Sequence, residues 1–134
     1  MKGGKIMDGK GGTVLIGLGT DIIEIKRIER VMQRPAFSKR IFTESERAWL
    51  QTKGKNLSQS AAGLFCAKEA VAKALGTGFS DGLCFCDIEI SHTQQGMPVV
   101  VRPHGRFLLS IAHCQTYAVA TAILLEEGEL HAGD

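Results

Sequence analysis

The sequence predicts an α+β fold for this chain. Alternating apolar and small residues near the start indicate one strand, and the residues that follow carry the apolar spacing of helices. From about residue 88 onward, short runs rich in β-branched residues, separated by turn residues, indicate two antiparallel hairpins. A strand, then helices, then antiparallel strands is the order of an α+β domain.

The first strand and helix are predicted close to the N-terminus. Residues 1–12 contain lysines and glycines but no apolar centre, so we expect a flexible extension or tag remnant rather than a signal peptide. Alternation over residues 14–20 predicts a strand that ends near Asp21. From Ile22 the pattern becomes helical, until Pro35 closes the helix by restricting the residue before it. The apolar stripe of this helix is Ile25, Ile28 and Met32.

Two further helices are predicted in the middle of the chain. Thr43 and Glu46 have the spacing of a capping box, which starts the second helix. Residues 52–56 are polar and indicate a loop. A serine at position 58 or 60 can cap the third helix, which runs to about residue 75 and stops at Gly76.

The remaining elements are strands. The predicted strands are residues 88–91, 99–102, 108–112 and 117–125. Pro98 suits a strand start, because proline cannot donate to a ladder. Residues 127–134 are polar and predicted to fray. We therefore expect one folded domain over residues 13–126.

Composition narrows the class of protein. A chain of 134 residues, 44% hydrophobic and 22% charged, is typical of one globular domain. A net charge of +2 does not favour nucleic-acid binding, and no apolar run reaches the roughly 18 residues of a membrane span. The cysteines fit no common zinc or disulfide spacing, so we expect reduced, mostly buried thiols in a cytoplasmic protein. They are Cys66, Cys84, Cys86 and Cys114.

One face of the third predicted helix carries candidate chemistry. Cys66, Glu69, Lys73 and Gly76 recur at helical spacing and therefore line one side. A metal on the carboxylate and a phosphate on the lysine would suit this face. The simpler alternative is an exposed Glu–Lys pair four residues apart, worth about 0.3–0.5 kcal/mol.

This helix also carries a family resemblance. The stretch from Phe65 to Gly78 resembles the F-x-x-K-E-A-x-x-K-A-x-G-T-G signature of the holo-acyl-carrier-protein synthases, of the 4′-phosphopantetheinyl transferase superfamily. Blocks 17–28 and 109–120 match the family in order and spacing, so the resemblance covers residues 16–126. It implies a helix packed on a small, mainly antiparallel sheet, assembled as a homotrimer.

The resemblance implies a reaction and its partners. The family transfers 4′-phosphopantetheine from coenzyme A to a serine of apo acyl carrier protein, with Mg²⁺, and releases adenosine 3′,5′-bisphosphate. This activity belongs to fatty acid biosynthesis. A hard divalent ion on one or two carboxylates suits attack on a pyrophosphate.

Site residues follow from the same resemblance. Asp21 and Glu69 are the implied Mg²⁺ ligands, although Asp21 taken alone would more simply be a helix N-cap. Lys73 and His113 are implied contacts to coenzyme A phosphates, and the Gly76-Thr77-Gly78 turn lets the backbone approach the nucleotide. Glu69, Lys73 and His113 are the implied catalytic residues. The serine proton is taken either by His113 or, as we prefer, by a magnesium-polarised water assisted by Glu69.

The partner surface is predicted on the first helix. Arg27, Arg30 and Arg34 recur opposite its apolar stripe, and the family uses this helix to receive the acidic carrier protein. A solvated basic face is the alternative. Leu64 and Ala112 depart from the family, which often has an arginine and a hydroxyl residue there.

Two other functions stay open. One is a magnesium-dependent hydrolase of coenzyme A or a related nucleotide, which would use the same carboxylates without a docking helix. The other is a non-catalytic module that binds coenzyme A or the carrier protein. If the chain is a trimer, we expect the site to lie between two subunits.

Overall fold

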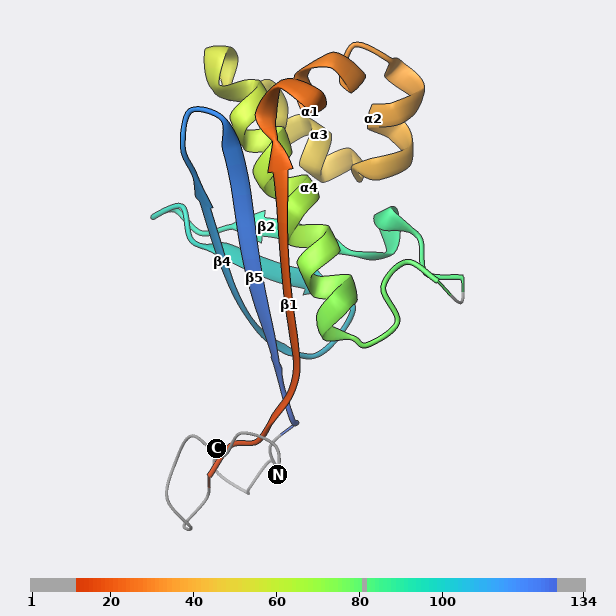
Figure 1. The fold of residues 1–134 in the computed structure, drawn as a ribbon, viewed down its shortest axis with the longest axis vertical. Coiled ribbons are helices and arrows are strands. Elements are labelled where there is room, and N and C mark those ends of the chain that lie inside the picture. The colour runs from red at the N-terminus through yellow and green to blue at the C-terminus, as the bar shows by residue number, and fades with distance from the viewer. Residues whose placement is uncertain (1–11, 81, 128–134) are drawn as a thin grey trace.

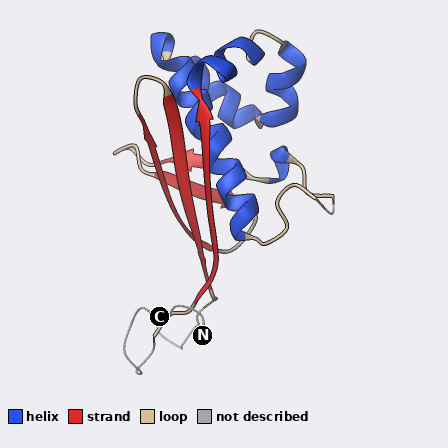
Figure 2. Cartoon of the chain, in the orientation of Figure 1, coloured by secondary structure: helices blue, strands red, loops and turns tan. Residues whose placement is uncertain are grey.

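The computed structural model describes residues 12–80 and 82–127 of the chain. The strands are β1 (Leu15–Glu24), β2 (Glu89–His92), β3 (Pro98–Arg102), β4 (Arg106–His113) and β5 (Tyr117–Leu125). The helices are α1 (Ile25–Val31), α2 (Pro35–Ile41), α3 (Glu44–Gln51) and α4 (Leu57–Ala74), with short 3₁₀ turns η1 (Gly54–Asn56) and η2 (Phe85–Asp87). Figure 2 separates the helices from the strands, and the predicted α+β class is confirmed.

The main sheet is antiparallel, with strand order β1-β5-β4, and β2 pairs with β3 in a second antiparallel sheet. The long helix α4 runs along the main sheet, while α1, α2 and α3 gather at one end of it (Figure 1). The core between α4 and β5 is built from small side chains, which let helix and sheet approach closely. Its buried alanines include Ala67, Ala70, Ala74, Ala118, Ala120 and Ala122.

Two glycines of β1 set the distance between this strand and α4. A Cβ at Gly17 would lie 1.9 Å from the carbonyl oxygen of Ala74, and a Cβ at Gly19 would lie 1.9 Å from that of Ala70. No side chain fits at either position, so only glycine permits the contact. Because side chains alternate along a strand, Asp21 follows Gly19 on the same face and is placed beside α4.

The opposite face of the main sheet is exposed and largely apolar. Leu18 is 70% exposed and Ile22 is 63% exposed on β1, and Leu108 of β4 is 54% exposed. A hydroxyl row crosses the middle of this outer face, since Thr20, Thr121 and Ser110 pair across the three strands. We call the outward side chains of β1, β5 and β4 the outer face.

The N-terminal elements differ from the prediction. β1 continues three residues past Asp21, and α1 begins at Ile25 rather than Ile22. Pro35 begins α2, a helix that was not predicted. A proline is accepted in the first turn of a helix because the N–H that it lacks would have no partner within the helix. The predicted single helix up to Pro35 was wrong because two short helices share this segment.

The other elements lie close to their predicted positions. The capping box is present, since Thr43 Oγ1 accepts from Glu46 N and Thr43 N donates to Glu46 Oε1. α4 starts at Leu57, after Asn56, so neither predicted serine cap is used. Gly76, with φ +91°, follows the end of α4 as predicted. The predicted terminal segments 1–12 and 127–134 lie outside the described residues, apart from residues 12 and 127.

In the part of the chain that the structure describes, no helix has the length and apolarity to cross a membrane. The four cysteines are unpaired. Only Cys66 is buried, whereas Cys84 and Cys114 are exposed and Cys86 is intermediate. The expectation that most thiols are buried was therefore wrong.

Candidate functional site

A cleft of about 420 Å³ opens where β1 meets the helices. It brings together Asp21, Glu69 and Arg27, which come from β1, α4 and α1. Its apolar walls include Phe37 and Phe65. Two acidic side chains and one arginine in an apolar-walled cleft make a candidate site for a charged ligand.

Asp21 belongs to the strand itself and not to a junction between strand and helix. The predicted strand end near Asp21 was wrong by three residues, because β1 extends to Glu24. It is therefore not the N-cap of α1, a position that Glu24 occupies without a side-chain hydrogen bond. Its carboxylate faces Lys73, whose Nζ lies 3.4 Å from Asp21 Oδ1 and donates to Thr20 O at 2.9 Å. Lys73 thus pairs with the strand, and among the described residues it makes no ion pair with Glu69.

Glu69 points into the same cleft from α4 and is partly buried. Burial raises the pKa of its carboxyl group, the nearby charge of Asp21 raises it further, and Lys73 partly offsets both effects. Both carboxylates line the same cleft, so a cation bound there would lower their repulsion.

The donor set of the cleft fits Mg²⁺. Two carboxylates supply hard oxygen ligands, and the open cleft leaves room for water and substrate oxygens to complete the shell. Among the described residues, no group of three or more His, Cys, Asp or Glu side chains could hold a metal. A protein-only cage of the zinc type is therefore not seen there, whereas Mg²⁺ commonly uses one or two carboxylates.

Cys66 is buried on α4, and its Sγ donates to Ala118 O at 3.4 Å. Burial, with the charges of Asp21 and Glu69, raises the pKa of its thiol to about 12. The group therefore stays a protonated thiol at neutral pH, and it packs as a small apolar residue.

The Gly76-Thr77-Gly78 turn directly follows α4. Gly76 and Gly78 have φ values of +91° and +58°, which favour glycine, and Gly78 N donates to Ala72 O. Thr77 and Gly76 are exposed. The turn therefore offers an accessible backbone next to Lys73, as the sequence predicts.

His113 is not brought to the carboxylates within one chain. It lines a second cavity of about 280 Å³, together with Trp49, Lys53 and His92. The register explains the separation: His113 pairs with Ala118 of β5, which pairs with Ile23 of β1. His113 and Ile23 therefore lie two strand spacings apart, roughly 10 Å, and Asp21 lies two residues further along β1.

The three arginines are all exposed. Arg27 and Arg30 belong to α1, but Arg34 is the N-cap of α2. The prediction of three arginines on one helix was therefore wrong for Arg34, because α1 ends at Val31. Only Arg27 lines the cleft.

Sequence reasoning missed the aromatic wall of the cleft. Phe37 lies on α2, the helix that was not predicted; a proline at the first helical position was the available signal. Tyr117 starts β5 and completes the wall. Of the two departures from the family, Leu64 lines the cavity of His113, and Ala112 is exposed on β4.

Comparison with known proteins matches these features to one family. A family model described as the 4′-phosphopantetheinyl transferase superfamily matches residues 17–122. The chain is 43% identical over 117 residues to a holo-[acyl-carrier-protein] synthase of Exiguobacterium sp., covering 86% of this chain and 96% of that protein. It is 40% identical over 114 residues to a synthase of that name from Bacillus cereus strain B4264, covering 83% and 96%.

Solved structures agree with the sequence relatives. A holo-(acyl-carrier-protein) synthase from Bacillus anthracis, in complex with CoA (3′,5′-ADP), has a TM-score of 0.78 and 39% identity, covering 84% of this chain and 98% of that chain. The synthase from Neisseria meningitidis has a TM-score of 0.75 and 31% identity, covering 83% and 98%.

Proposed function

The chain belongs to the 4′-phosphopantetheinyl transferase superfamily, within the holo-[acyl-carrier-protein] synthases, and from this premise we propose that it transfers 4′-phosphopantetheine from coenzyme A to a serine of apo acyl carrier protein. The co-product is adenosine 3′,5′-bisphosphate, and the transfer requires Mg²⁺. One observation carries the proposal. Asp21 and Glu69 come from two separate signature segments and line a single cleft with Arg27.

Asp21 and Glu69 would hold the Mg²⁺ ion. When bound, the ion would neutralise charge on the pyrophosphate and polarise the phosphorus that is attacked. Glu69, whose pKa is raised by burial and by Asp21, is suited to accept the serine proton, directly or through a water. Lys73 would move from Asp21 to the coenzyme A phosphates, which a flexible ammonium can reach without fixed bidentate geometry.

Coenzyme A would lie along the end of α4. Lys73 binds phosphate, and the exposed Gly76-Thr77-Gly78 turn lets the nucleotide approach the backbone. The apolar wall of Phe37 and Phe65 suits the uncharged pantetheine arm. The relative from Bacillus anthracis, whose structure contains CoA, supports this choice of co-substrate.

The carrier protein would dock on α1. Arg27 and Arg30 on α1 and Arg34 at the N-cap of α2 are exposed, and Arg27 lines the cleft. Acidic side chains of the carrier would complement this charge, so the encounter would be fast at low salt and slower at high salt.

We propose that three copies assemble through the outer face. Exposed apolar side chains on one side of a sheet mark an interaction surface, and closed rotational symmetry is usual for identical chains. His113 and Glu69 do not share a cavity within one chain, so His113 would serve the carboxylates of a neighbouring subunit. Assembly would therefore complete the active site. With its unpaired cysteines, the protein suits a reducing, cytoplasmic location.

The proposal is tested by the intact mass of an apo acyl carrier protein after incubation with the chain, coenzyme A and Mg²⁺. We expect a gain of one phosphopantetheine group that is lost with chelator and with Glu69→Gln. Glu44→Gln, an exposed carboxylate on α3, is the matched control and should keep full activity.

Other outcomes would select the alternatives. Coenzyme A consumed without any carrier protein would favour a hydrolase. Binding of coenzyme A without turnover at saturating Mg²⁺, across several carriers, would favour a binding module. Either result would overturn the transferase assignment.

A further inference from the structure

Lys68 directly precedes Glu69 on α4 but points into the protein. Its side chain and that of Glu46 are both 0% exposed, and the Nζ–Oε1 distance between them is 2.7 Å. Lys68 Nζ also donates to Phe85 O at 2.9 Å and to Ile88 O at 2.5 Å. An ammonium group has three N–H donors, and here each has a partner.

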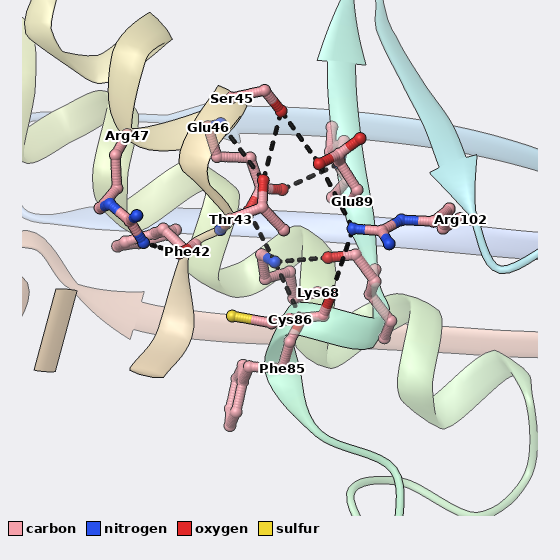
Figure 3. Close-up of polar contacts among 12 residues, drawn as sticks. Phe42, Thr43, Ser45, Glu46, Arg47, Lys68, Phe85, Cys86, Glu89 and Arg102 are labelled. Atoms are coloured by element: carbon pink, nitrogen blue, oxygen red, sulfur yellow. Dashed lines mark hydrogen bonds and ion pairs between the residues drawn. The ribbon is translucent and has the colours of Figure 1, made fainter. Parts of the chain in front are cut away.

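Glu46 is equally saturated. Its Oε1 accepts from Thr43 N, and its Oε2 accepts from Ile90 N, both at 2.8 Å. Figure 3 shows Lys68 between Glu46 on one side and Phe85 on the other. The pair therefore ties α4 to the start of α3, to η2 and to β2. Such a pair fixes positions, because moving any one segment leaves a buried polar group without its partner.

The segment that Lys68 holds carries aromatic contacts to the cleft. The ring of Phe85 stacks on Phe65, with centroids 5.4 Å apart, and Phe65 lines the cleft beside Glu69. The ring of Phe85 also stacks on Phe79, with centroids 3.8 Å apart. Phe79 immediately follows the Gly76-Thr77-Gly78 turn. Fixing the carbonyl of Phe85 therefore fixes both the cleft wall and the turn.

We propose that Lys68 is a positioning residue: through its buried contacts with Glu46, Phe85 and Ile88, it sets the orientation of Glu69 and the conformation of the turn after α4. The inference rests on the proposed function, in which Glu69 holds Mg²⁺ and the turn receives coenzyme A. Lys68 touches no substrate, so it acts only through the segments that it joins. Burial lowers its pKa, and Glu46 opposes that effect.

The first test needs no activity. Hydrogen exchange would be compared between the wild-type chain and Lys68→Met, a variant of similar length without the ammonium. We expect at least about tenfold faster exchange at Gly78 and Ile88, whose N–H groups bond within the held segments, because those segments would open locally. Exchange in the β1–β5 ladder should be unchanged. Unchanged exchange at Gly78 and Ile88 would overturn the proposal.

The second test separates positioning from stability. Lys68→Met leaves Glu46 as an unpaired buried carboxylate, and adding Glu46→Gln removes that charge. The double variant should recover thermal stability relative to Lys68→Met. It should still show a kcat about 10- to 100-fold below wild type and a raised Mg²⁺ concentration for half-maximal rate. If stability and activity recover together, Lys68 is only structural.

Two comparisons complete the design. Arg102→Met removes a partly exposed pair with Glu89 and a hydrogen bond to Cys86 O in η2, both at 3.4 Å. Because these long, solvent-exposed contacts contribute little, kcat and exchange should stay near wild type. If Lys68→Met does not fold, the double variant carries both readouts. If the wild-type chain modifies no carrier protein, the proposed function fails, whereas the exchange comparison still decides whether Lys68 holds the turn.

Discussion

Lys73 Nζ lies 3.4 Å from Asp21 Oδ1, so the cation implied in phosphate binding is held by a carboxylate implied in metal binding. A lysine and a divalent cation cannot both neutralise Asp21 without competing for it. The side chain of Lys73 is half exposed, which leaves it free to exchange this partner for a phosphate.

Lys73→Met should therefore affect the two ligands in opposite directions. Without coenzyme A, Mn²⁺ should bind up to about fivefold more tightly, since an exposed ion pair contributes below about 1 kcal/mol. Coenzyme A should bind about tenfold more weakly, because a hydrogen bond to a charged group is lost. Calorimetric titration measures both affinities, with Lys39→Met on α2 as the control. Weaker Mn²⁺ binding in Lys73→Met would contradict the competition.

The titration of Glu69 should respond to both neighbours. Burial and Asp21 hold its pKa above the usual 4.5, and Lys73 lowers it. Asp21→Asn should therefore lower the pKa of Glu69, and Lys73→Met should raise it. Carboxyl carbon NMR of the metal-free chain follows this titration directly. A Glu69 that titrates at its ordinary value in all three chains would show that the carboxylates are independent.

The close packing of β1 on α4 should not tolerate one methyl group. Gly19→Ala should destabilise the fold by about 3 kcal/mol, because the new Cβ meets a backbone oxygen that cannot move aside. Gly63→Ala is the matched control, since its Cβ would meet only a methyl of Ile111, at 3.0 Å. Urea unfolding gives both values. Equal effects would mean that α4 can shift away from β1.

Arg27 should matter for the carrier protein more than for coenzyme A. Arg27→Ala should raise the KM for the carrier by about tenfold, with a smaller effect at high salt, because the contact is electrostatic. The KM for coenzyme A should change little. Lys55→Ala, which removes an exposed lysine in η1, should leave both constants unchanged. A salt-independent effect of Arg27→Ala would point to packing instead.

Mixing two inactive variants should restore activity if the site lies between subunits. Glu69→Gln keeps His113, and His113→Ala keeps Glu69, so a mixed trimer contains some intact pairs. An equal mixture, unfolded and refolded together, should give about one quarter of wild-type activity. Each site needs Glu69 from one subunit and His113 from its neighbour, and each of these two positions holds the required variant about half of the time. No recovery, in a mixture shown to exchange subunits, would place both residues in one chain's site.

Local signals in the sequence were sufficient for several elements. The capping box at Thr43 and the glycine at position 76 predicted helix ends that the structure confirms. The alternating run of β5 predicted its bounds, Tyr117–Leu125. Each of these depends on neighbours within a few residues, where propensity and spacing carry the information.

Features that depend on distant residues were not predictable in the same way. Pro35 can either follow a helix or begin one, and only the packing of α2 decides. The separation of His113 from Glu69 follows from the order β1-β5-β4, which spacing along the chain does not determine. Lys68 pairs with Glu46 on α3, and the difference of their residue numbers, 68 − 46, is 22. No local sequence pattern links two residues this far apart.

Alternate residues of β1 face two different surroundings, α4 on one side and the outer face on the other. Its inward positions, Gly17, Gly19 and Asp21, admit α4 and shape the cleft, while outward positions such as Leu18 and Ile22 form the apolar outer face. A single inserted residue would exchange the two sets, because side chains alternate with a period of two. Leucine and isoleucine would then meet α4, and the acid would face outward. A substitution in β1 therefore alters either the cleft or the outer face, whereas a change in the length of this ten-residue strand would alter both at once.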